Sequence, residues 1–96
     1  MKAQRIRPES FEIYNNLGSI MFQKYKQIEA KDFYKRSLSL NPNYLPTLNN
    51  LALLYHRLNY ANEALSISKK ALQIDKNNIF AKTNYALALS INGKLD

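Results

Sequence analysis

Identical residues recur at a spacing of 34 positions along this chain. Asn16, Asn50 and Asn84 form one such series. A fixed period of this length is typical of stacked repeats, in which each unit buries its apolar face only against its neighbours. The usual function of such an array is to present a long surface, so the period points to binding. The other residues that recur in this frame are Asn15/Asn49, Leu17/Leu51, Ala52/Ala86, Leu53/Leu87, Glu29/Glu63, Ala30/Ala64, Lys35/Lys69, Leu38/Leu72 and Asn43/Asn77.

Apolar residues follow a helical period throughout the repeats. Tyr14, Leu17, Ile20 and Met21 form one stripe, and similar stripes follow in each later segment. The alternation typical of strands is absent, and Pro42 interrupts the pattern where a helix is disfavoured. The sequence therefore predicts five helices, near residues 9–23, 27–40, 45–57, 61–74 and 79–91.

The ends of these segments carry capping signals. Ser10 precedes the first stripe, where a hydroxyl accepts from early backbone amides. Asn59 and Gly93 stand just after a helix, where a left-handed residue often closes the turn. Tyr25 occupies the same place in the first repeat and tolerates that conformation poorly. We therefore expect the first hairpin to turn differently or more loosely.

The composition excludes several function classes. The chain has 96 residues and no cysteine, so thiolate metal sites and disulfides are excluded. It has one histidine, no glycine-rich phosphate loop and no metal-spaced cluster, so we expect neither catalysis, nor a cofactor, nor a metal. No apolar run reaches the length of a membrane span. Residues 1–8 are expected to form a basic, flexible N-terminus with no secretory signal, which favours a cytoplasmic location.

These residues resemble the tetratricopeptide repeat, a helix–turn–helix unit of 34 residues with a large–x–x–Leu–Gly–x–x–Tyr pattern followed by Ala, an aromatic residue, Ala and Pro. The resemblance implies an all-α fold, a right-handed α-solenoid of antiparallel helix pairs with about two and a half units: 11–44, 45–78 and a partial unit 79–96. Four places depart from the pattern: Tyr25, Lys76, Ser68 and Lys82. The matching residues are Tyr14, Leu17, Gly18, Met21, Ala30, Tyr34, Ser37 and Pro42, then Leu48, Leu51, Ala52, Tyr55, Ala64 and Ala71, then Tyr85, Ala86 and Leu89.

The resemblance also implies a concave groove lined by the first helix of each unit. It would hold an extended peptide or partner segment, as in a scaffold or adaptor. An asparagine amide both donates and accepts, so Asn16, Asn50 and Asn84 are predicted to form a ladder that pairs with a peptide backbone. The alternative is that they bond neighbouring helices. The groove residues placed by the resemblance are Glu12, Asn15, Asn16, Ser19, Phe22, Gln23, Asn49, Asn50, Leu53, His56, Arg57, Phe80, Thr83, Asn84, Leu87 and Ile91.

Some members of the family clamp the C-terminal carboxylate of a peptide with lysines, an arginine and asparagines. At the matching places of this chain only Asn50 fits, and every cation is missing. The sequence therefore disfavours that mode and favours a partly apolar groove formed by Phe22, Leu53, Phe80 and Leu87, in which His56 and Arg57 could meet an acidic group of the ligand.

Two further surfaces give rival hypotheses. The face of Ala86 and Leu89 has no following helix in the sequence, and an uncovered apolar stripe tends to find a partner. Either the chain is a fragment of a longer array, or two copies associate there. The net charge of +7 includes a basic stripe on the second helices (Lys35–Arg36 and Lys69–Lys70), but no platform for stacking bases is evident. Nucleic-acid binding is therefore the weakest hypothesis.

Overall fold

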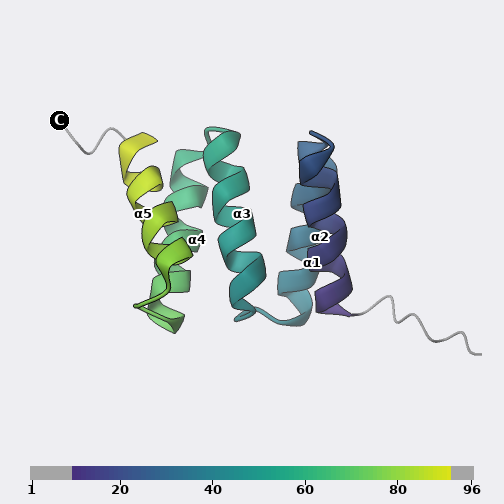
Figure 1. Cartoon of the computed structure of the whole chain (residues 1–96), viewed down its shortest axis with the longest axis horizontal. Coiled ribbons are helices and arrows are strands. Elements are labelled where there is room, and N and C mark those ends of the chain that lie inside the picture. Colours follow the sequence, from purple (N-terminus) through teal and green to yellow (C-terminus); the bar gives the residue numbers. More distant parts are fainter. Residues whose placement is uncertain (1–9, 92–96) are drawn as a thin grey trace, which may run out of the picture. The chain divides into compact units, whose positions relative to one another are not determined.

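The computed structural model describes residues 10–91, and these form five α-helices and no strand. The helices are α1 (Phe11–Gln23), α2 (Gln27–Leu40), α3 (Leu45–Arg57), α4 (Ala61–Ile74) and α5 (Ile79–Ile91) (Figure 1). The predicted all-α class and the bounds of the last four helices are confirmed. The first helix begins at Phe11 rather than at residue 9, because Ser10 is its N-cap and its hydroxyl accepts from the Ile13 amide at 3.3 Å.

The chain divides after Pro42 into two compact units. The N-terminal unit contains α1 and α2, which pack against each other. In the C-terminal unit, α4 packs against both α3 and α5, and α3 also contacts α5. Gly93 and the basic residues 1–8, for which the sequence made predictions, lie outside the described residues.

The N-terminal unit is closed by contact between a glycine and an aromatic ring. A Cβ atom placed on Gly18 would lie 2.6 Å from two ring carbons of Tyr34, so only glycine lets the helices approach this closely. Tyr34 is 1% exposed, and its hydroxyl lies 3.1 Å from Ser19 Oγ. Burial raises the pKa of Tyr34, and the Ser19 hydroxyl partly opposes that rise. At the other end of the pair, Ser37 Oγ donates to the Phe11 carbonyl at 2.8 Å.

The C-terminal unit buries one face of α3 beneath α4. Leu48, Leu51, Ala52 and Tyr55 recur at helical spacing on α3 and are all buried. The facing helix supplies small side chains, which let two helix axes come close while larger neighbours fill the gaps. Those small buried residues of α4 are Ala64, Ser68 and Ala71.

The turn after α1 corrects the prediction for Tyr25. Its φ is 62°, nearly the same as the 64° of Asn59 at the end of α3. Both turns also close alike, because Lys26 N donates to Met21 O at 2.9 Å and Tyr60 N donates to Tyr55 O at 2.8 Å. The expectation of a different or looser first hairpin is therefore wrong. Helix packing imposes the left-handed conformation, and the tyrosine side chain extends into solvent.

Candidate functional site

A cavity of about 450 Å³ opens between α3 and α5 of the C-terminal unit. Five of its lining residues come from α3, and the other three lie just before α5 or in its first two turns. We call it the α3–α5 groove. It is lined by Leu45, Pro46, Asn49, Asn50, Leu53, Asn78, Phe80 and Asn84.

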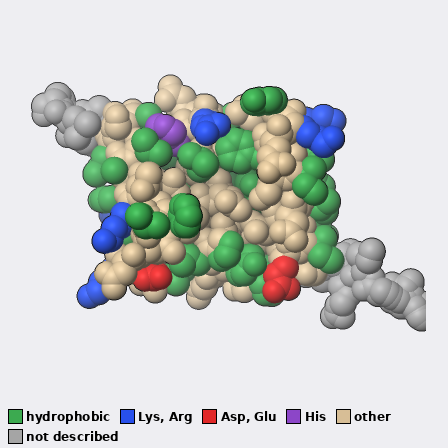
Figure 2. All heavy atoms as spheres, viewed as in Figure 1, with side chains coloured by type: hydrophobic (Ala, Val, Ile, Leu, Met, Phe, Trp, Pro, Cys, Tyr) green, Lys and Arg blue, Asp and Glu red, His purple; other side chains and the backbone are tan. Residues whose placement is uncertain are grey.

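Helical periodicity brings these side chains to one surface. Leu45, Asn49 and Leu53 are four residues apart on α3, and Phe80 and Asn84 are four apart on α5. Residues at this spacing share one helix face. In Figure 1, α3 and α5 lie in front of α4, so the view in Figure 2 shows the surface that they form. Several hydrophobic side chains reach that surface, and charged ones are few.

Three asparagines join α5 to α3 through hydrogen bonds, and we call them the asparagine clasp: Asn49, Asn78 and Asn84. Asn78 Oδ1 accepts from the Ala81 amide at 3.0 Å, which caps the first turn of α5. The same oxygen accepts from Asn49 Nδ2 at 3.1 Å. One turn further along α5, Asn84 Nδ2 donates to the Asn49 carbonyl at 3.0 Å. Asn49 is therefore held through both its side chain and its backbone.

The walls beside the clasp are apolar and uncharged. Phe80 is 65% exposed, although it is a large aromatic residue. None of the lining residues carries a charge. Inside the clasp, Asn49 Oδ1 is buried without a hydrogen-bond partner. Unpaired buried acceptors are uncommon in proteins and call for an explanation.

The structure brings five of the predicted groove residues of the C-terminal unit together: Asn49, Asn50, Leu53, Phe80 and Asn84. The sequence missed Leu45, Pro46 and Asn78 as lining residues. An asparagine immediately before a helix is a capping signal, and that signal at residue 78 would have placed its side chain at the start of α5.

The remaining predicted residues of this unit lie outside the lining. Leu87 and Ile91 are half-buried, whereas Arg57 and Thr83 are exposed. His56 is half-buried in the last turn of α3, and its Nδ1 atom is buried without a hydrogen-bond partner.

The predicted residues of the N-terminal unit lie on α1. Asn15 is buried, and Asn16 is exposed. Ser19 is engaged with the Tyr34 hydroxyl of α2. Phe22 is half-buried, and Glu12 and Gln23 are exposed. Thus α1 presents Asn16 to solvent and uses Ser19 to bind its neighbouring helix.

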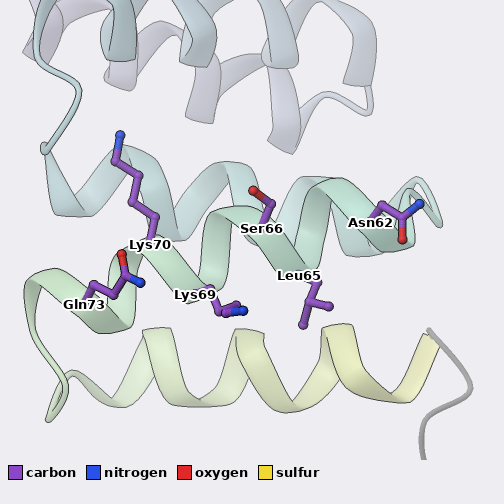
Figure 3. A pocket seen from close by; sticks show the side chains of 6 residues that line it. All are labelled: Asn62, Leu65, Ser66, Lys69, Lys70 and Gln73. Carbon is purple, nitrogen blue, oxygen red and sulfur yellow. The ribbon is translucent and has the colours of Figure 1, made fainter.

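A second hollow runs along α4 and contains the basic pair of the sequence analysis. Figure 3 shows Leu65 and Lys69 on the side of α4 nearer to α5, whereas Lys70 extends away from α5. Two cations that diverge in this way do not converge on one phosphate group. The hollow is lined by Asn62, Leu65, Ser66, Lys69, Lys70 and Gln73.

Residues 10–91 contain no group of three or more His, Cys, Asp or Glu side chains placed to hold a metal ion. Within the same residues, no helix is both long enough and apolar enough to cross a membrane.

The sequence profile of the tetratricopeptide repeat matches residues 11–44 and 45–78. The chain belongs to the tetratricopeptide repeat family. Both the resemblance drawn from the sequence and the all-α solenoid class are thereby confirmed. Domains of this fold are typically scaffolds that bind other proteins and do not catalyse reactions.

Known relatives are similar to this chain over part of their length and are longer. The chain is 41% identical over 66 residues to the uncharacterized protein ycf37 of Pyropia yezoensis, covering 69% of this chain and 37% of that protein. It is 31% identical over 85 residues to a UDP-N-acetylglucosamine–peptide N-acetylglucosaminyltransferase of Giardia intestinalis, covering 88% of this chain and 6% of that enzyme. The crystal structure of MamA protein is similar with a TM-score of 0.83 and 28% identity, over 88% of this chain and 46% of that one.

Proposed function

We propose that this chain is a protein-interaction module that binds an extended segment of a partner protein in the α3–α5 groove, as a scaffold or adaptor. The observation that carries the proposal is the cavity itself, because it opens at the helix faces where the repeat pattern predicts a ligand. Its volume falls within the range of about 300–1,000 Å³ typical of ligand pockets.

The surface around the cavity supports the same function. Phe80 is mostly exposed, and Leu53 and Asn50 beside it are half-exposed. A partner that covers such side chains gains apolar contact. Among the relatives, the transferase from Giardia acts on peptides, as its name states.

A selection of displayed random peptides tests this function. We expect selected peptides to lose affinity about fivefold or more on Leu53→Ala, because truncating a central contact residue costs more than about 1 kcal/mol of binding free energy. Asn62→Ala is the matched control, since Asn62 is exposed on α4 and does not line the groove. Selected peptides that bind equally well to both variants would refute binding in the groove.

A second candidate function is self-association through α5, and the exposure of Ala86 favours it. The equivalent residues of the earlier repeats, Gly18 and Ala52, are both buried. Ala86 is exposed, and Leu89 is half-buried although its equivalent Tyr55 is only 6% exposed. The face formed by Ala86 and Leu89 is therefore open on α5.

Sedimentation across a concentration series separates the two functions. Association through α5 predicts a mass that rises with concentration and returns to the monomer value on Ala86→Glu, because a buried carboxylate without a partner opposes assembly. Thr83→Glu is the control, since Thr83 is exposed on the same helix and does not line the groove. A monomer at every concentration refutes self-association and leaves binding in the groove unaffected.

A further inference from the structure

We infer that the α3–α5 groove selects its partner by one bulky, uncharged apolar side chain, such as leucine or phenylalanine, and that the asparagine clasp supports the walls instead of reading the partner's backbone. The inference rests on the proposed function and names the chemistry of the segment that the groove takes.

The walls of the groove supply the apolar contact. Four of its eight lining residues are Leu45, Pro46, Leu53 and Phe80. Phe80 exposes 65% of its surface, and covering that surface would remove apolar area from water. An apolar side chain of the partner gains contact with these four walls, whereas a polar group would lose hydration against them.

The absence of charge in the lining argues against an acidic side chain or a terminal carboxylate as the bound group. The chain carries a net charge of +7, yet no lysine or arginine among residues 10–91 lines this cavity. An acidic side chain or a terminal carboxylate entering the groove would lose water and meet no counter-charge. The neutral walls therefore discriminate against charged segments even though the protein as a whole attracts anions.

Two side-chain NH₂ groups of the clasp donate to the protein itself. Asn49 Nδ2 donates to Asn78, and Asn84 Nδ2 donates to the Asn49 carbonyl. Asn84 is only 8% exposed. These bonds hold the first two turns of α5 at a fixed distance from α3 and so preserve the separation of the apolar walls. Of the three asparagines in the predicted ladder, Asn84 thus serves as a strut between helices.

Two adjacent residues provide a matched test. Ile79 and Phe80 are 68% and 65% exposed, and of the two only Phe80 lines the groove. The probes are N-acetyl-leucine amide and N-acetyl-phenylalanine amide at millimolar concentration, with N-acetyl-aspartate amide and N-acetyl-lysine amide as charged counterparts. Binding is followed by the ¹H–¹⁵N chemical shifts of the backbone and of the asparagine side chains.

We expect the two apolar probes to shift the resonances of Leu53 and Phe80, and the charged probes to leave them in place. Phe80→Ala should weaken apolar binding about tenfold, as for loss of a central contact, and Ile79→Ala should leave it unchanged. The side-chain amide resonance of Asn84 should stay protected from exchange when a probe binds. Stronger binding of the charged probes, or no shift of groove residues by any probe, overturns the inference.

Displayed peptides distinguish failure of this inference from failure of the proposed function. Selected peptides that need Leu53 but carry no common apolar residue contradict the apolar anchor and leave groove binding intact. Selected peptides that are indifferent to both Leu53→Ala and Phe80→Ala contradict the proposed function as well.

Discussion

Replacement of Gly18 by alanine tests the close approach of α1 and α2. The new Cβ atom would lie 2.6 Å from Cδ1 and from Cε1 of Tyr34, and 3.1 Å from Cζ. The ring cannot move aside easily, because Tyr34 is 1% exposed and its hydroxyl is hydrogen-bonded to the Ser19 hydroxyl. The helices or the ring must therefore shift to accept a single methyl group.

Two opposing effects set the magnitude. Alanine in a helix interior is favoured over glycine by about 1 kcal/mol. Overpacking a dense core costs about 1–3 kcal/mol, and contacts this short lie toward the upper end. We therefore expect Gly18→Ala to lower the free energy of unfolding by about 1–2 kcal/mol. In urea denaturation followed by circular dichroism, the midpoint should fall while the slope stays the same.

The comparison with the next repeat supplies the control. There the equivalent positions hold Ala52 and Ser68, both buried. Ala52 is larger than Gly18, and Ser68 is smaller than Tyr34, so a larger residue on the first helix is matched by a smaller one on the second. In a Tyr34→Leu background, Gly18→Ala should become neutral or stabilising by up to about 1 kcal/mol, since only the helix preference remains. Hydrogen exchange should place the loss in α1 and α2. A parent-background Gly18→Ala protein as stable as the parent would refute the reasoning.

Three other predictions concern a turn, a buried phenol and the clasp. Tyr25→Gly should raise the free energy of unfolding, measured by urea denaturation, by about 1 kcal/mol, because glycine removes the cost of a positive φ. Tyr25→Phe is the control, and an equal gain in stability from it would contradict the explanation. Burial raises the pKa of Tyr34, so the folded state holds the phenol proton more tightly than the unfolded state does. The resulting contribution to the free energy of unfolding is complete below the unfolded pKa of about 10, and it is lost as the pH rises through the pKa of the folded state. Urea midpoints at pH 8 and pH 11 should therefore fall less in Tyr34→Phe than in the parent, and an identical fall would count against this origin. Asn78→Ala should cost about 1–2 kcal/mol and speed amide exchange in α5, because it removes the cap and the bond from Asn49; Asn78→Asp keeps an acceptor and should stay close to the parent, and matching losses in the two variants would refute the role of the clasp.

The helices were predictable because their signals are local and repeated. Apolar spacing and the break at Pro42 placed α2 to α5 at the observed residues, and Ser10 caps α1 as its position suggests. Tyr25 shows where local preference fails. The residue disfavours a positive φ, but packing of α1 on α2 outweighs a cost of about 1–2 kcal/mol.

The candidate site was predictable only in part. Helical spacing puts Asn49, Asn50 and Leu53 on one face, and the structure places all three in the lining of the groove. The hydrogen bonds of the Asn49 and Asn84 amides depend on residues about 30 positions away, as in the 3.0 Å bond from Asn84 to the Asn49 carbonyl. No local pattern states whether such an amide faces a ligand or a neighbouring helix.

The sequence by itself determined that this chain builds tetratricopeptide repeats. The 34-residue period and the helical stripes are present in the sequence itself, and they do not depend on how the helices pack against one another. Only the tertiary structure decided how the repeated positions are used. Gly18 admits the Tyr34 ring, Ala86 is exposed, and Asn84 ties α5 to α3. The physical reason is that burial and hydrogen-bond partners depend on which helix lies opposite, and the repeats present the same position to different neighbours.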